Sequence, residues 1–254
     1  MPGRDGTLLA LDLHVHSDAS YDGHEPVELI LEHAADIGLD GVVITDHDRI
    51  EASRHAADIA REFGLVGVPG VEVSTADGHL LAIGVDERPP RGEPLAETVE
   101  IVREHGGAAV VPHPFQRTRH GVRKSRLTDC DAIEVYNSMV FTGYQNRRAR
   151  KFADKLNYGQ VGGSDAHYLM NVGRAYTVFE LEEPVDRAAE VSSDQIVDAL
   201  RSGQTRVHGI RTPILQSTQQ YAIGAARKSL YEVTSRLPYV AARPRAIAEF
   251  MSDS

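Results

Sequence analysis

The sequence predicts an α/β fold, because short apolar runs alternate with helical patterns from residue 7 to about residue 208. This alternation is typical of βαβ units with a mainly parallel sheet, either closed into a barrel or open and doubly wound. Nearly every predicted strand ends in a polar side chain of a ligand-binding type. Many successive strands contribute such side chains in a barrel, whereas an open sheet gathers them at one switch point. We therefore expect a barrel with a site at the carboxyl ends of its strands.

The predicted strands are apolar runs of four to eight residues, which is the usual length of a buried strand. They span residues 8–15, 41–45, 65–68, 80–85, 108–111, 132–136, 160–163 and 175–179. A further apolar strand, residues 70–74, carries one carboxylate, Glu72, at its centre. Burying an unpaired carboxylate is costly, so Glu72 requires a cation, either an arginine or a metal.

The predicted helices lie between these strands and show apolar residues at helical spacing. Pro26 suits the first turn of one helix, and Gly38 and Gly64 suit positions just after two helix ends. The helices are expected over residues 26–37, 50–63, 95–104, 144–155 and 194–201.

Length and composition exclude several classes of protein. The 254 residues suffice for a full hydrophobic core, and 41% hydrophobic with 25% charged residues excludes a disordered chain. No apolar stretch approaches the roughly 20 residues of a transmembrane helix. The single cysteine, Cys130, excludes a disulfide scaffold and is interpreted as a buried structural thiol. Because the first residues also lack a signal-peptide pattern, we expect a cytoplasmic protein that does not associate with membranes.

The charge is distributed unevenly along the chain. The formal net charge is -10, yet residues 210–254 carry a net charge of +3. We therefore expect a barrel domain over residues 1–209 and a basic helical extension over residues 210–254. Residues 213–237 form an amphipathic helical pattern, with Ile214 and Leu215 on its apolar side. This pattern fits packing on the barrel or on a partner; a basic tail that guides a nucleic-acid end is the alternative.

Two strand ends carry ionisable side chains at alternate positions. His14 and His16 end the first predicted strand. Because side chains alternate across a strand, both imidazoles point to one face, close enough to share a metal ion. Asp165 and His167 repeat this spacing after a later strand. The alternatives are two solvated histidines on an edge strand for the first pair and an Asx-type turn for the second.

Three more histidines adjoin predicted strands. His47 follows a strongly apolar run, His79 begins another, and His113 lies between two prolines after a third. A single histidine of this kind is more often a hydrogen-bonded structural residue. Six histidines together with carboxylates, all at strand ends, are hard to explain as structure alone, and they predict a metal centre.

In this order, the polar residues resemble the four motifs of the PHP (polymerase and histidinol phosphatase) family. The matching segments are His14-Val-His16, Asp22-Gly23, Thr45-Asp46-His47, Gly70-Val-Glu72, His113-Pro114 and Gly163-Ser-Asp165-Ala-His167. The resemblance covers roughly residues 8–180. It implies a distorted seven-stranded TIM-like α/β barrel with two or three metal ions for phosphoester hydrolysis.

The resemblance also implies how the ligands are divided. Asp22 stands where some family members have histidine. Three of the ligands, Glu72, Asp165 and His167, are also expected to act in catalysis. The implied groups are His14, His16, Glu72 and Asp165 for one ion; Glu72, His79 and His113 for a second; and Asp22, His47 and His167 for a third.

The residue types agree with this chemistry. Mixed imidazole and carboxylate ligands favour Mn, Zn or Fe over Ca and Mg, which prefer oxygen ligands. Two ions about 3.5–4 Å apart clamp the attacking and leaving oxygens and lower the pKa of a bridging water. The expected step is therefore in-line attack of a metal-bridged hydroxide on phosphorus, without a covalent intermediate. Six other histidines are interpreted as bystanders: His24, His33, His55, His105, His120 and His208.

A basic cluster follows His113, and arginine matches phosphate in bidentate geometry. We hypothesise that part of this cluster receives substrate phosphate, with Arg117 and Arg119 as the first candidates. A solvated charged loop is the alternative. The cluster consists of Arg117, Arg119, Arg123, Lys124 and Arg126.

The sequence thus predicts a metal-dependent phosphoesterase. Its substrate would be a phosphorylated small molecule, such as a nucleotide or histidinol phosphate, or the end of a short nucleic acid. The 40 residues between Glu72 and His113 leave no room for an inserted domain, which favours small substrates. One alternative is a non-catalytic PHP module that binds metal or phosphate for regulation, which degraded ligand positions would indicate. Another is a metal-dependent amidohydrolase on a similar barrel.

Overall fold

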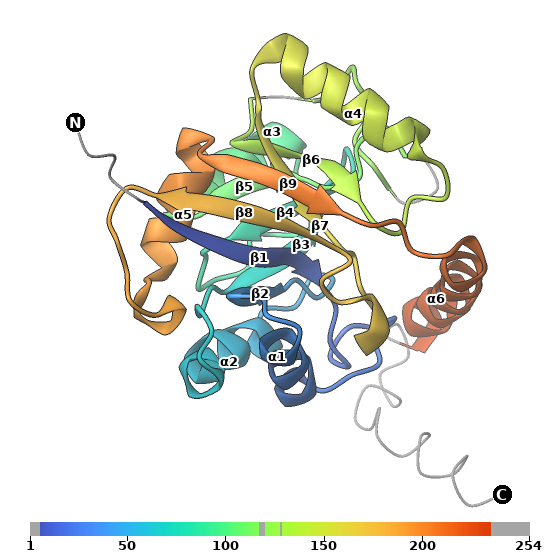
Figure 1. Ribbon diagram of the computed structural model, residues 1–254. Helices are drawn as coiled ribbons and strands as arrows, with labels where there is room; N and C mark the ends of the chain where they lie inside the picture. Colours follow the sequence, from blue (N-terminus) through green and yellow to red (C-terminus); the bar gives the residue numbers. More distant parts are fainter. Residues whose placement is uncertain (1–5, 117–119, 128, 235–254) are drawn as a thin grey trace, which may run out of the picture.

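The computed structural model describes residues 6–116, 120–127 and 129–234. In this part of the chain nine strands form one sheet of four and one sheet of five. The four-stranded sheet has the order β2-β1-β8-β9 (Figure 1). Its strands are β1 (Thr7–Val15), β2 (Gly41–Ile44), β8 (Ala175–Leu181) and β9 (Thr205–Gly209).

The five-stranded sheet follows chain order, β3-β4-β5-β6-β7. Its first two strands pair antiparallel across a short turn, and the run with Glu72 is the first of them. The strands are β3 (Gly70–Ser74), β4 (His79–Ile83), β5 (Ala108–Val111), β6 (Ala132–Asn137) and β7 (Gly159–Gly163).

Strand direction differs from the prediction of a mainly parallel sheet, which is wrong. Pairs β1–β2, β5–β6 and β6–β7 are parallel. Pairs β1–β8, β3–β4, β4–β5 and β8–β9 are antiparallel. The short β3–β4 turn leaves no room for a crossover helix, and a parallel pair would require one.

The prediction of one closed barrel also requires correction. Among the described residues the two sheets are joined by isolated bridges, such as Val15–Ala166 and His47–Glu72, and not by a continuous ladder. Residues 65–68, predicted as a strand, form only a bridge at Val66. Their backbone packs on helix α2 instead, since a Cβ at Gly67 would lie 2.2 Å from the carbonyl oxygen of Ala57. This contact interrupts the ladder between the sheets.

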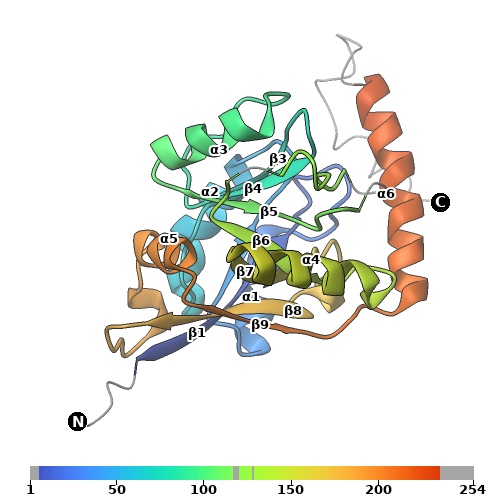
Figure 2. The same cartoon turned by 90° about the horizontal axis from the view of Figure 1, so that it is seen from above.

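The helices cover the outer faces of the sheets, and α6 stands apart at one end (Figures 1 and 2). The five helices predicted within residues 26–201 are confirmed, and Gly64 ends the second one with φ 77°. None of the described helices is long and apolar enough to cross a membrane. The helices are α1 (Val27–Asp36), α2 (Glu51–Ile59) with a 3-10 turn (Ala60–Phe63), α3 (Leu95–Glu104), α4 (Gly143–Leu156), α5 (Ser193–Ser202) and α6 (Ile214–Thr234).

One apolar core fills the space between the two sheets. Leu11 of β1 and Phe179 of β8 are fully buried in the same cluster as Leu81, Val110 and Val161 of the other sheet. Because apolar side chains from both sheets meet here, the sheets enclose a common interior. The carboxyl ends of β1, β2, β3, β5, β6 and β7 are thereby held at one side of the molecule, where the antiparallel strand β4 begins.

At the start of α6, two residues of the predicted apolar side are exposed. Ile214 is 54% exposed and Leu215 is 71% exposed, whereas Ser217 and Gln220 are buried. The predicted helix end at residue 237, like the rest of the extension after residue 234, lies outside the described residues.

Candidate metal centre

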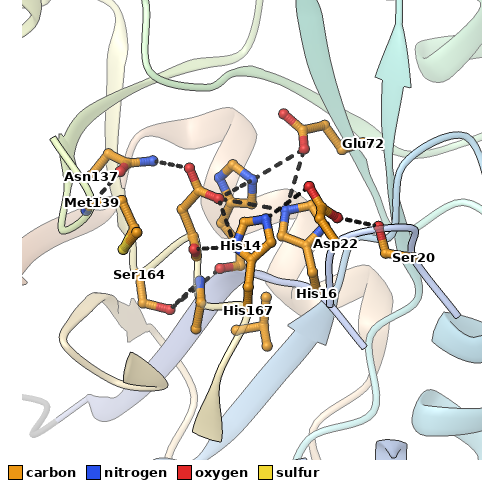
Figure 3. A network of polar contacts seen from close by, with 12 residues as sticks. His14, His16, Ser20, Asp22, Glu72, Asn137, Met139, Ser164 and His167 are labelled. Atoms are coloured by element: carbon orange, nitrogen blue, oxygen red, sulfur yellow. Dashed lines mark hydrogen bonds and ion pairs between the residues drawn. The ribbon is translucent and has the colours of Figure 1, made fainter. Parts of the chain in front are cut away.

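The structure brings all nine predicted ligands together where β1, β2, β5 and β7 end and at the β3–β4 pair. His14, His16, Asp22, Glu72 and His167 are labelled in Figure 3. Alternation along β1 directs His14 and His16 to the same face, as predicted, and both rings are buried. The other ligands come from the segments after β1, β2, β5 and β7 and from the β3–β4 pair: Asp22, His47, Glu72, His79, His113, Asp165 and His167.

Glu72 lies at the centre of the cluster and is 1% exposed. Among the described residues no arginine pairs with it, so imidazoles surround the carboxylate that the sequence predicts to need a cation. One carboxylate that touches this many imidazoles can bridge two ions. Its contacts are Oε1 to His79 Nδ1 at 2.7 Å and His113 Nε2 at 3.1 Å, and Oε2 to His14 Nε2 at 3.4 Å, His16 Nε2 at 3.4 Å and His47 Nδ1 at 3.1 Å.

The ligand atoms form four overlapping groups, within each of which they lie within 4.8 Å of one another. The ligands predicted for the first ion form one group, without Glu72. Those predicted for the second ion are divided between two groups, and those predicted for the third ion are joined by His16. The division of ligands among individual ions stays a prediction. The groups are His14, His16 and Asp165; His14, Glu72 and His113; His47, Glu72 and His79; and His16, Asp22, His47 and His167.

Buried nitrogen atoms without hydrogen bonds show that the cluster fits metal ions. His16 is 1% exposed, yet neither of its ring nitrogens forms a hydrogen bond with a described residue. Buried polar groups are normally paired, because an unpaired one loses its hydration without compensation. His16 Nε2 nevertheless lies 3.4 Å from Glu72 Oε2 and 3.6 Å from Asp165 Oδ1. A cation between these atoms would satisfy all three residues.

The charges of the cluster are strongly coupled. Burial alone would lower the pKa of His47, but the carboxylates of Glu72 and Asp22 outweigh burial and raise it to about 9. Burial lowers the pKa of His16 to about 3, and repulsion from His167 adds to this shift. Burial would raise the pKa of Glu72, but the surrounding imidazoles, His79 first, hold it well below its usual range. In the metal-free protein, the carboxylates therefore keep some of these histidines protonated.

The loop that carries Asp22 is fixed by contacts within itself and with Asp46 after β2. Ser20 Oγ donates to Asp22 Oδ1 at 2.7 Å (Figure 3). The backbone N–H of Ser17 donates to Asp46 Oδ1 at 2.7 Å. Gly23 packs so closely that a Cβ there would lie 1.9 Å from the Ser17 carbonyl oxygen. Asp22 Oδ2 is thereby placed 3.1 Å from His167 Nε2.

Glu134, which the sequence reasoning missed, and Asn137 at the end of the same strand orient the ligands. Glu134 is 1% exposed; its Oε1 lies 3.1 Å from His14 Nδ1, and its Oε2 accepts from the N–H of His113 at 2.7 Å. Asn137 Nδ2 donates to Glu134 Oε2 and to Asp165 Oδ2, both at 3.0 Å. The sequence contains a signal for Glu134, because it is a lone carboxylate in an apolar strand, as Glu72 is.

We expect Glu134→Gln to weaken Mn binding about 10- to 100-fold, the usual cost of losing a group that orients a metal ligand. The amide cannot accept all the hydrogen bonds that Glu134 accepts, so His14 and His113 lose their fixed orientation. Isothermal titration with Mn would measure the change. Glu180→Gln is the matched control, because Glu180 lies on the surface of β8 and pairs with Arg206. Unchanged Mn affinity in Glu134→Gln would contradict the orienting role.

The remaining predicted residues differ in their positions. Arg117 and Arg119 lie outside the described residues. His120, interpreted as a bystander, stacks on His79 with ring centroids 5.2 Å apart. His24 also lies near the cluster, where Arg227 of α6 approaches its ring at 3.3 Å. Cys130 is 4% exposed, which confirms that the thiol is buried, and burial raises its pKa to about 12.

Comparison with known proteins agrees with this geometry. The family model described as PHP domain matches residues 12–147, and the one described as PHP-associated matches residues 143–205. An uncharacterized protein of Methanocaldococcus jannaschii is 27% identical over 76% of this chain and 79% of its own. The phosphoribosyl 1,2-cyclic phosphate 1,2-diphosphodiesterase of Eggerthella lenta is 38% identical over 31% of this chain and 32% of its own.

A similar fold occurs in a solved structure from Bacteroides vulgatus, a two-domain protein containing a predicted PHP-like metal-dependent phosphoesterase. The TM-score is 0.63 at 19% identity, and the match covers 85% of this chain and 71% of that one.

Proposed function

Since the chain belongs to the PHP family, we propose that it is a metal-dependent phosphoesterase acting on a phosphorylated small molecule or on the end of a short nucleic acid. The observation that carries this proposal is the buried cluster of nine candidate ligands around Glu72, in which neither ring nitrogen of His16 forms a hydrogen bond with a described residue. Mixed imidazole and carboxylate ligands suit two or three ions of Mn, Zn or Fe.

The residues of the chain hold their ligand atoms in defined orientations. Glu134 lies against His14 Nδ1, which directs His14 Nε2 toward Glu72 and Asp165. His167 Nδ1 lies 2.8 Å from the carbonyl oxygen of Asp165, and its Nε2 faces Asp22. Asn137 binds Asp165 Oδ2, so that Oδ1 faces the histidines of β1.

This arrangement supplies what phosphoester hydrolysis requires. Bound divalent metals polarise a phosphoryl oxygen and lower the pKa of a coordinated water, so no serine or cysteine nucleophile is needed. Glu72 would hold metal through both carboxylate oxygens, because they face different sets of imidazoles. We assign Asp165 and His167, which adjoin the β1 histidines and Asp22, to proton movement at the reacting water.

The test combines metal analysis with a substrate panel. We expect the purified protein to hold two to three transition-metal ions, measured by mass spectrometry, and to release phosphate or nucleotide when Mn is supplied. The panel contains nucleoside monophosphates, histidinol phosphate, 5′-phosphorylated oligonucleotides and amides. Full metal loading without hydrolysis of any phosphoester would contradict the proposal and favour a regulatory module. Cleavage of amides alone would favour an amidohydrolase.

A further inference from the structure

We propose that three arginines around Tyr136 form a phosphate-binding site that is separate from the metal centre. The arginines are Arg150 of α4, Arg174 directly before β8 and Arg211 after β9. None of the three is a candidate metal ligand. The site therefore does not depend on the reaction proposed for the metal centre.

The segment after β9 crosses the last residues of β6 and holds Arg211 there. Gly209 lies against the Tyr136 ring, since a Cβ at Gly209 would lie 2.4 Å from both Cδ1 and Cε1 of that ring. The N–H of Thr212 donates to the carbonyl oxygen of Ser138 at 2.8 Å, and the hydroxyl oxygens of these two residues lie 2.9 Å apart. Arg211 lies between these two points of contact, so its position beside Tyr136 is fixed by the fold.

Arg174 is bound to the same segment through both its backbone and its side chain. The N–H of Ile210 donates to the carbonyl oxygen of Arg174 at 2.5 Å, and Arg174 Nη2 donates to the carbonyl oxygen of Arg211 at 3.0 Å. Arg174 Nε is buried and forms no hydrogen bond with a described residue. Withdrawing a charged group from water without an opposite charge is costly. Arg174 therefore requires a counterion, as Glu72 does at the metal centre.

Helix α4 brings the third arginine to the same end of β6. The N–H of Asn137 donates to Asn146 Oδ1 at 3.2 Å, and Asn146 Nδ2 donates to the carbonyl oxygen of Asn137 at 3.1 Å. Arg150 follows Asn146 by four residues, so it lies on the same side of α4. The three guanidinium groups thus come from three separate segments that are each bonded to their surroundings.

The charges around Tyr136 are positive and lack carboxylate partners. Burial raises the pKa of Tyr136, and all three guanidinium groups oppose this shift. In the described part of the chain the ion pairs of arginine involve other arginines, such as Arg206, which pairs with Glu180 at 2.7 Å. Three unpaired guanidinium groups in one place form a binding site for an anion.

The surroundings favour phosphate over a carboxylate as this anion. Phosphate carries a charge of about -1.5 to -2 at pH 7, and its several oxygens can accept from guanidinium groups that approach from different directions. Helix α4 has five basic residues and one acidic residue, although the whole chain carries a net charge of -10. This local field favours a multiply charged ligand. Free phosphate and the backbone of a nucleic-acid strand both supply the required group.

Titration of the metal-loaded protein with inorganic phosphate tests the site. We expect Arg150→Ala and Arg211→Ala each to weaken phosphate binding at the arginines about 10- to 100-fold, the effect of losing a charge-assisted contact. Both side chains are exposed, so both variants should fold. Arg150→Lys should recover part of the loss. Arg61→Ala removes an exposed arginine from the 3-10 turn after α2 and is the matched control.

A single-stranded oligonucleotide of about 12 nucleotides with hydroxyl groups at both ends distinguishes the two sources of phosphate. Weaker binding of inorganic phosphate alone in the two alanine variants would identify free phosphate as the ligand. Weaker binding of the oligonucleotide, measured by fluorescence anisotropy, would identify a nucleic-acid strand. If both variants bind both probes as the wild type and Arg61→Ala do, the site is overturned.

Hydrolysis at the metals separates this inference from the proposed function. Both alanine variants should keep wild-type kcat for a nucleoside monophosphate and wild-type metal content, because neither residue is a candidate ligand. If the loaded protein hydrolyses no phosphoester but the variants lose phosphate or oligonucleotide binding, the arginine site holds and the proposed reaction fails.

Discussion

Replacing Glu72 with glutamine is expected to lower phosphoesterase activity at least about 1,000-fold, because a bridging ligand places the ions whose electrostatic stabilisation contributes several kcal/mol. Both carboxylate oxygens contact imidazoles, at distances from 2.7 to 3.4 Å. An amide offers one neutral oxygen where the centre has two charged ones. We also expect the variant to lose at least one ion per chain, measured by mass spectrometry on protein purified beside the wild type.

Glu180→Gln is again the control, since that carboxylate is 53% exposed on β8 and should keep full metal content and activity. A circular dichroism spectrum and a melting curve establish that Glu72→Gln is folded. A folded Glu72→Gln protein with wild-type metal content and activity would contradict the assignment of Glu72 as a bridging ligand.

Removal of the metal is expected to destabilise the fold as well as abolish activity. A site held at 1,000 times its Kd stabilises the native state by about 4 kcal/mol. For a chain of this size that corresponds to a fall in Tm of about 8–16 °C when a chelator strips one ion. Calorimetry of chelated and Mn-reloaded protein measures the shift. Reloading with Mg should restore less, because imidazole ligands disfavour it. Equal Tm values with and without chelator would contradict a metal-filled native state.

Metal binding should also release protons. Burial would lower the pKa values of both His14 and His47, but neighbouring carboxylates raise them, to about 9 for His47. These rings therefore hold protons at pH 7 in the metal-free protein, and an ion must displace them. Apparent Mn affinity should consequently rise with pH up to about 9. Titrations in buffers with different ionisation enthalpies measure the released protons, and a pH-independent affinity would contradict this linkage.

The candidate site could be predicted from the sequence more completely than the fold. His14 and His16 follow from strand alternation alone, since two imidazoles two residues apart must point to one face. Glu72 follows from the cost of burying a lone carboxylate. Glu134 obeys the same reasoning and was missed because no neighbouring motif drew attention to its strand. His120 could not be found in this way, because its stacking on His79 depends on the path of a loop.

The fold prediction failed where contacts between distant segments decide the outcome. Periodicity identified the positions of most elements, yet residues 65–68 have a strand-like composition and form a single bridge, at Val66. Close packing of Gly67 on Ala57 outweighs their local preference. The direction of β4 could not be predicted either, because it depends on the length of the turn that begins after Ser74. Ile214 and Leu215 at the start of α6 are exposed, so the amphipathic pattern predicts the helix but does not fix how these two side chains pack.

The bridge between Val15 and Ala166 has a consequence for how the protein acquires its metal. It joins the first strand to the segment after β7, and Asp12 accepts from the N–H of Ser164 across a separation of 152 residues. Contacts this distant in sequence form late, because closing a long loop costs conformational entropy before the contacts can stabilise it. His14 and Asp165 therefore meet only when the chain is nearly folded. An ion between His14 and Asp165 would be captured only after β7 has joined β1, whereas the two groups that contain Glu72 do not require β7.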